Sequence, residues 1–160
     1  MPIITIEGPD KCGKSTLFAG LRDIWIGPTF VDPPPYGKSR MSIAAQLAER
    51  DLELWETFYE PTKLYVANRH VIVSDAVYSN VYDRPTLRYS WIRKHLFVVY
   101  IEVSCEELRH RCHTCSEDVQ SPEQYAIVKE YYKLVLKDFP HIVVGSTHTP
   151  MMVKELLNGR

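Results

Sequence analysis

Long apolar runs are missing from this sequence. The longest, residues 96–101, contains six residues, whereas a helix that spans a membrane needs roughly 20. A basic segment ahead of the first apolar residues is missing as well, so we expect neither a transmembrane helix nor a signal peptide. Cysteine is scarce, with four in 160 residues. In a chain without an export signal we expect these thiols to be reduced, which favours a cytoplasmic protein.

Charge of one sign is not in excess either. The chain has 19 lysines and arginines against 20 aspartates and glutamates, a formal net charge of −1. This balance disfavours a strongly basic nucleic-acid-binding protein, although it leaves room for a local basic patch. The hydrophobic fraction of 45% and the charged fraction of 24% are typical of a globular protein and exclude a disordered chain, a fibrous repeat and a coiled coil. The length predicts a single domain over residues 1–160.

Short β-branched segments alternate with segments of helical periodicity along the chain. The predicted strands are residues 2–7, 29–31, 70–74, 96–103 and 141–144. The predicted helices are residues 14–25, 39–49, 52–68, 106–111, 121–137 and 150–157. Because strands joined through helices run parallel, we predict an α/β fold with a parallel sheet of about five strands and helices on both faces.

A phosphate-binding loop is the most specific feature of the sequence. Residues 8–15, GPDKCGKS, match the pattern G-x-x-x-x-G-K-[ST] at every fixed position. Glycines let backbone N–H groups point at phosphate oxygens, and the following helix directs its positive end at the same anion. Lys14 would reach the terminal phosphates of ATP, and the Ser15 hydroxyl would bind Mg²⁺. The residues expected to bind the nucleotide are Gly8, Pro9, Asp10, Lys11, Cys12, Gly13, Lys14, Ser15 and Thr16. A strand before the loop and a helix after it indicate the P-loop NTPase type of α/β fold.

Asp75 is the second candidate for the metal site. It directly follows the predicted strand 70–74, and a carboxylate at the end of an apolar strand typically holds the water shell of Mg²⁺ in P-loop enzymes. The alternative is an aspartate that only caps the next helix. Beside the phosphate loop we favour the metal role, with Ser15 and Asp75 as the two magnesium residues.

The opening of the chain resembles the opening of thymidylate kinases. Residues 4–17, ITIEGPDKCGKSTL, combine an apolar strand, Glu-Gly and an acidic residue two positions after the glycine. Residues 71–79, VIVSDAVYS, look like that family's strand with its Asp-Arg-aromatic motif. Residues 100–111 and 121–136 are similar to the segments before and after the family's lid, and residues 144–146 resemble the loop that borders the adenine. The resemblance therefore covers most of the chain in order.

The resemblance implies a nucleoside monophosphate kinase with a short lid at about residues 112–121. Such an enzyme would transfer the γ-phosphoryl group of ATP, with Mg²⁺, to a deoxynucleoside 5′-monophosphate, dTMP being the first choice. Asp10 would contact the sugar hydroxyl of the acceptor, and Lys38 or Arg40 would hold its phosphate, with Arg50 as a weaker candidate. The implied partners are nucleotide substrates and a second copy of the chain in a homodimer.

The cation that stabilises the transferring phosphate is also inferred from this resemblance. Thymidylate kinases carry it either in the phosphate loop or in the lid, and residues 113–120 contain no lysine or arginine. We therefore predict Lys11 as this cation, with Arg111 assisting at the start of the lid. The predicted catalytic residues are thus Lys14, Lys11, Asp10, Asp75 and Arg111.

An aromatic cluster offers candidates for stacking on the acceptor base. Trp55, Phe58, Tyr59 and Tyr65 fall near helical spacing in the predicted helix 52–68, and the more common meaning of such spacing is a helix face in the core. Phe58 is the residue we select for base stacking, because this helix lines the acceptor site in the family. Tyr78 is a second candidate with the same alternative.

Three departures from the family pattern keep other functions open. Ala76 stands where an arginine is usual, residues 32–36 (DPPPY) replace an Arg-Glu-Pro signature, and the chain is short. One alternative is therefore a deoxynucleoside kinase. Another is a bacteriophage-type kinase that acts on a modified base in DNA, in the cytoplasm of the host. An alternative of another class is a nucleotide-binding switch or ATPase module.

A zinc-stabilised binding module is the last alternative. Cys112 and Cys115 form a C-x-x-C pair, with Cys105 and His110 nearby, and four such side chains could hold zinc tetrahedrally. A second pair at the usual spacing is missing, and free cysteines on a helix face are common core residues. The sequence therefore favours the kinase over the zinc module.

Overall fold

A parallel sheet forms the centre of the protein. The computed structural model describes residues 2–9, 12–33, 41–113 and 122–159. The strands are β1 (Ile3–Glu7), β2 (Thr29–Val31), β3 (Tyr65–Asn68), β4 (Leu96–Ile101) and β5 (His141–Val144). They lie in the order β2-β3-β1-β4-β5, and every neighbouring pair is parallel. The predicted α/β fold with a five-stranded parallel sheet is confirmed.

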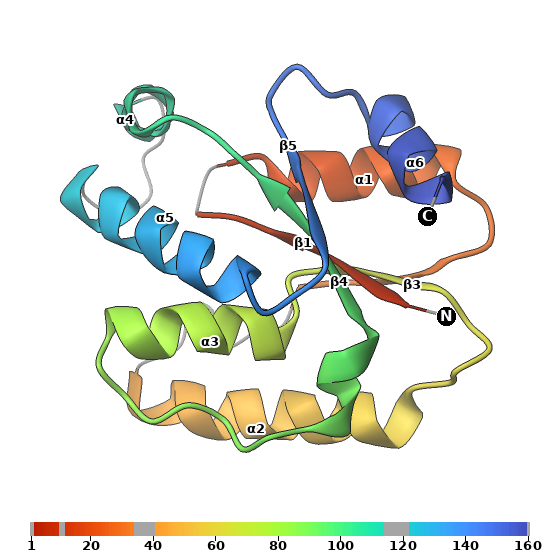
Figure 1. The fold of residues 1–160 in the computed structure, drawn as a ribbon, viewed down its shortest axis with the longest axis horizontal. Coiled ribbons are helices and arrows are strands. Elements are labelled where there is room, and N and C mark those ends of the chain that lie inside the picture. Colours follow the sequence, from red (N-terminus) through yellow and green to blue (C-terminus); the bar gives the residue numbers. More distant parts are fainter. Residues whose placement is uncertain (1, 10–11, 34–40, 114–121, 160) are drawn as a thin grey trace.

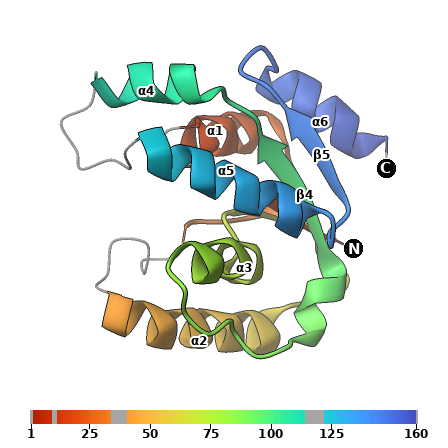
Figure 2. The ribbon, with the colours of Figure 1, turned by 60° about the vertical axis from the view of Figure 1, so that its left-hand side comes forward.

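Helices cover both faces of the sheet. They are α1 (Lys14–Ile24), α2 (Met41–Phe58), α3 (Val71–Val81), α4 (Cys105–His113), α5 (Pro122–Leu136) and α6 (Pro150–Asn158), with a 3₁₀ helix η2 (Trp91–His95) before β4. Helices α1 and α6 lie side by side on one face (Figure 1). On the other face α3 lies between α2 and α5 (Figure 2). None of these described helices is both long and apolar enough to cross a membrane.

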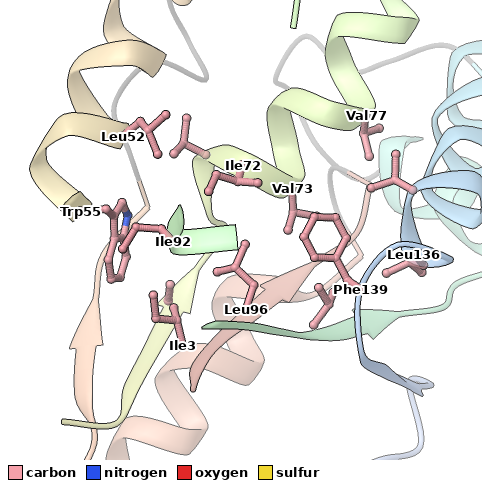
Figure 3. Packing of buried hydrophobic residues seen from close by; sticks show 14 of the residues in the cluster. Ile3, Leu52, Trp55, Ile72, Val73, Val77, Ile92, Leu96, Leu136 and Phe139 are labelled. Atoms are coloured by element: carbon pink, nitrogen blue, oxygen red, sulfur yellow. The ribbon is translucent and has the colours of Figure 1, made fainter. Parts of the chain in front are cut away.

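The two faces of the sheet carry separate hydrophobic clusters, as the two-residue period of a strand requires. Ile4 and Ile6 of β1 pack with Leu21 of α1 on one side. Ile3 of the same strand packs with α2 and α3 on the other, where Trp55 belongs to the same cluster. Figure 3 shows this second cluster filling the space between the sheet, α2, α3 and the end of α5. Burial of each large side chain contributes about 1.5–3 kcal/mol.

One predicted strand is wrong. Residues 70–74 do not form a strand: Val71 begins helix α3, and the preceding strand is β3, four residues of what we predicted as the helix 52–68. Helix α3 lies between two other helices and the sheet, so residues 71–75 are all buried. A short apolar segment that is buried on every side has the same residue pattern whether it forms a strand or a helix.

The end of helix α2 explains the other boundary error. The helix ends at Phe58, and its last turn is closed by a hydrogen bond from the N–H of Tyr59 to the carbonyl oxygen of Trp55 (2.9 Å). Pro61 follows two residues later, and a proline disfavours helical geometry in the residue before it. The chain therefore turns at residues 59–64 and enters β3. The predicted lid at 112–121 lies outside the described residues from 114 onward.

His70 caps the start of helix α3. Its Nδ1 accepts a hydrogen bond from the N–H of Ile72 (3.1 Å), and its ring lies against that of Trp55, with 4.7 Å between centroids. The side chain is fully buried, and this burial lowers the pKa of His70 from its usual 6.5 to about 3. A ring that accepts through Nδ1 carries its proton on Nε2 and is neutral.

This burial predicts an acid-sensitive fold. The unfolded chain protonates His70 below pH 6.5 while the folded chain does not, so stability is full above pH 6.5 and is lost as the pH falls toward 3. The loss contributed by this residue approaches about 1.4 kcal/mol per pH unit. Urea unfolding between pH 7 and 5 measures it. His70→Asn, which keeps a cap but cannot titrate, should show the smaller slope, and His110→Asn at an exposed position on α4 is the control substitution. Equal slopes for wild type and His70→Asn would contradict the prediction.

Candidate functional site

The phosphate loop connects the centre of the sheet to helix α1. β1 ends at Glu7, and the helix begins at Lys14. Gly8 and Gly13 have φ values of 154° and 105°, which favour glycine. A Cβ at Gly8 would lie 2.6 Å from Cys12 Sγ and 3.2 Å from the carbonyl oxygen of Ile101. The loop is thus packed against β4, and a side chain at Gly8 would disrupt it.

Lys14 lies across the loop. Its Nζ donates to the carbonyl oxygens of Gly8 (2.7 Å) and Pro9 (2.8 Å), and it is 3.8 Å from Cys12 Sγ. Within the described part of the chain no side chain caps the start of α1, which follows Gly13 directly. The first N–H groups of a helix lack partners inside the helix and attract anions. A cation beside a helix start is an arrangement suited to phosphate.

The end of β3 adjoins this loop. Asn68 pairs with Ile6 across the β1–β3 ladder, so the next residue, Arg69, is level with the end of β1. The N–H of Arg69 donates to the carbonyl of Ile6 (3.1 Å), and its φ of 70° is in the left-handed region. A non-glycine residue there is uncommon and often marks a functional turn. Sequence reasoning missed Arg69 because the strand itself was assigned to residues 70–74.

Ser15 is the candidate metal residue that the structure describes in the phosphate loop. Its Oγ accepts a hydrogen bond from Asn68 Nδ2 (3.3 Å). Among residues 2–9, 12–33, 41–113 and 122–159, no group of three or more His, Cys, Asp or Glu could hold a metal ion. Mg²⁺ usually keeps several waters and takes few protein oxygens in addition to substrate phosphates. A hydroxyl beside the phosphate loop fits an ion that binds together with a nucleotide.

Glu7 is a buried carboxylate behind the loop. Its Oε1 accepts from Thr5 Oγ1 and from the N–H of His70, both at 2.7 Å. Its Oε2 lies 3.3 Å from Ser74 Oγ and 3.3 Å from the hydroxyl of Tyr132. Burial raises the pKa of Glu7, while hydrogen bonds and the charges of two nearby cations act in the opposite direction. Sequence reasoning noted this residue only as part of a Glu-Gly pair.

The premise for Asp75 as a magnesium residue is wrong. Asp75 lies within helix α3 rather than after a strand. Its Oδ1 accepts from Arg84 Nη1 (2.7 Å) and its Oδ2 from the N–H of Leu87 (2.8 Å). It lines a pocket of about 250 Å³ between α3 and residues 86–93, which includes no phosphate-loop residue. Asp75 therefore fastens a loop to its helix.

Phe58 is also not where the sequence predicted. It is the last residue of α2, and its side chain is 70% exposed. Its carbonyl accepts from the hydroxyl of Tyr65 (3.5 Å), the first residue of β3. The phosphate loop lies at the opposite, carboxyl end of the strands. Phe58 therefore cannot stack on a base held beside that loop.

Tyr78, Arg50 and Arg111 remain candidates of different kinds. Tyr78 on α3 lies near the site, with 5.8 Å between the guanidinium carbon of Arg69 and its ring centre. Arg50 is exposed on α2. Arg111 on α4 donates through Nε to Glu107 (3.1 Å). The other predicted site residues Asp10, Lys11, Lys38 and Arg40 lie outside the described residues. So does Cys115 of the zinc alternative.

The parallel sheet, its strand order and the phosphate loop after its central strand define the fold of the P-loop kinases. The YorR protein of Bacillus subtilis, solved with phosphorylated GDP, is similar over 98% of this chain and 94% of its own, with a TM-score of 0.67 and 19% identity. Deoxyadenosine kinase from M. mycoides, solved with dATP, is similar over 98% of both chains, with a TM-score of 0.63 and 14% identity.

A third similar structure is the thymidylate kinase of Candida albicans. It has a TM-score of 0.63 and 15% identity over 99% of this chain and 89% of its own. No protein-family model and no curated protein sequence matches the chain. The shared property is therefore the fold, and the two neighbours that are kinases by name are named for different acceptors.

The contacts of Asp75 predict a structural phenotype. Asp75→Asn removes the charge that pairs with Arg84, and both partners are largely buried (4% and 19% exposed). Breaking a buried ion pair costs about 3 kcal/mol, which urea unfolding measures. The matched control Asp32→Asn breaks the exposed pair with Arg22 and should cost less than about 1 kcal/mol. A stable Asp75→Asn protein with an altered Mg²⁺ response would restore the metal role.

Proposed function

We propose that the protein is an ATP-dependent kinase that transfers the γ-phosphoryl group to a deoxynucleoside 5′-monophosphate, with dTMP the first acceptor to test. The observation that carries this proposal is the contact of Lys14 with the Gly8 and Pro9 carbonyls at the start of α1. Arg69 follows the end of the neighbouring strand β3, level with the end of β1. The similar folds of a thymidylate kinase and of a protein solved with phosphorylated GDP support a nucleotide acceptor.

The chemistry needs little beyond positioning and charge. An oxygen of the acceptor phosphate attacks the γ-phosphorus, the bond to the bridging oxygen breaks, and ADP leaves. Loop N–H groups and the Lys14 ammonium stabilise the charge on the transferring oxygens. Ser15 would help to hold Mg²⁺, which neutralises phosphate charge when it is bound. Asp10 is proposed to accept a hydrogen bond from the sugar hydroxyl of the acceptor.

A second candidate is a deoxynucleoside kinase. The similarity to deoxyadenosine kinase supports it. The acceptor therefore has to be found by assay. We measure ADP release with a panel of deoxynucleoside monophosphates, free deoxynucleosides and DNA.

Lys14→Ala is expected to lower kcat by about 10²-fold or more while the protein stays folded, because the transferring phosphate loses its nearest cation. The assay is ADP release with the best acceptor from the panel. Lys137→Ala, at an exposed position beyond α5, serves as control and should keep the wild-type rate. A folded Lys14→Ala protein with wild-type turnover would remove the kinase assignment.

Three positively charged side chains are candidates for stabilising the transferring phosphate in the transition state. Arg69→Met and Lys11→Met are each expected to lower kcat by about 10²-fold, because Lys11 belongs to the phosphate loop by sequence and Arg69 follows the strand next to β1. Arg111→Met on α4 should cost only a few-fold, in keeping with an assisting role. Steady-state kcat and KM for ATP are the measurements. A loss confined to Arg111→Met would identify a lid arginine as the main cation instead.

A further inference from the structure

We propose that Glu7 is a positioning residue that holds the Arg69 guanidinium at the phosphate loop through the hydroxyl of Ser74. This inference rests on the proposed function, since it assigns Arg69 to the phosphates. It concerns a buried carboxylate to which the phosphate-loop motif gives no role. The evidence is a chain of hydrogen bonds that joins three elements behind the loop.

The chain of hydrogen bonds runs in one direction. Arg69 Nε donates to Ser74 Oγ (3.4 Å), and Ser74 Oγ donates to Glu7 Oε2 (3.3 Å). A hydroxyl has one proton and two lone pairs, so Ser74 accepts from the guanidinium through a lone pair and gives its proton to the Glu7 carboxylate, which orients the hydroxyl toward both partners.

The same carboxylate also reaches the phosphate loop. The hydroxyl of Tyr132 lies 3.3 Å from Glu7 Oε2 and 3.4 Å from the carbonyl oxygen of Gly8. That carbonyl accepts from Lys14 Nζ at 2.7 Å. Glu7 is therefore linked to Arg69 through one hydroxyl and to the Lys14 contact through another. Figure 2 shows α3 and α5, which supply these hydroxyls, adjacent on one side of the sheet.

Charge explains why a carboxylate is suited to this position. Glu7 is fully buried, and burying an ionised carboxylate is costly without compensation. Its compensation comes from four donors and from the positive charges of Arg69 and Lys14, both of which act on it. A neutral residue would fill the same space at lower cost but would not attract the charges of Arg69 and Lys14.

Helix α3 itself offers a matched control. Ser74 and Ser79 are both buried serines on this helix (1% and 2% exposed). Ser79 Oγ has no hydrogen-bond partner among the described residues. Ser74→Ala and Ser79→Ala therefore remove the same atom from the same helix, and only the first interrupts the path from Glu7 to Arg69.

The test is a double-mutant cycle of Ser74→Ala with Arg69→Met, read out by kcat and by the affinity for inorganic tripolyphosphate measured calorimetrically. Ser74→Ala is expected to lower both about tenfold in the wild-type background and to have no further effect in Arg69→Met. Ser74→Thr, which retains the hydroxyl, should restore wild-type values, and Ser79→Ala should leave them unchanged. Glu7→Gln should behave as Ser74→Ala does; urea unfolding checks that each variant is folded.

Equal losses from Ser74→Ala in both backgrounds, or no loss at all, would overturn the inference. A wild-type protein that phosphorylates no acceptor would instead overturn the proposed function. In that case the tripolyphosphate cycle still decides the positioning role, because it requires only the phosphate site. Additive losses of tripolyphosphate affinity would then reject it.

Discussion

A negative charge without access to water is the constraint around which this site is built. Glu7 ends the central strand, where every side chain is buried, and its carboxylate must find donors inside the protein. It finds them on β1, at the start of α3 and on α5. Satisfying one carboxylate therefore fixes how two helices approach the sheet, and it does so directly behind the phosphate loop.

The phosphate loop could be located from the sequence because its chemistry is local. Gly8, Gly13, Lys14 and Ser15 lie within eight consecutive residues, so their spacing in the sequence is enough to predict the geometry of the loop. The five-stranded parallel sheet was predicted correctly for a similar reason, since alternation of strands and helices needs no long-range information. Local patterns, rather than tertiary ones, account for what could be predicted.

The remainder depended on contacts between distant segments. Residues 71–73 are apolar and Ser74 and Asp75 are buried because α3 is enclosed by α2, α5 and the sheet, and that environment cannot be read from the residues themselves. Because residues 70–74 were predicted as a strand, Asp75 was assigned to the metal site. For the same reason Arg69, which follows the actual strand β3, was not predicted as a site residue. Pro61 was the one local signal that the helix 52–68 had to end early.

The fold points to where phosphate binds, but it does not identify the acceptor. Similar folds include a deoxyadenosine kinase and a thymidylate kinase, and one fold commonly supports several substrates. What distinguishes them is the set of side chains around the acceptor. Among the predicted acceptor residues that the structure describes, only Tyr78 lies near the site, with its ring close to the Arg69 guanidinium.

Residues 82–90, between α3 and η2, form neither helix nor strand, yet side chains of two helices hold them at two places. Asp75 holds Arg84 and the N–H of Leu87, and Glu56 of α2 holds Arg88 and Ser90. Loops ordinarily accept inserted residues at little cost. In this one an insertion between the two attachment points would move them out of register with partners on separate helices. The segment thus acts as a strap between α3 and α2, and the number of residues between its two attachment points matters to both.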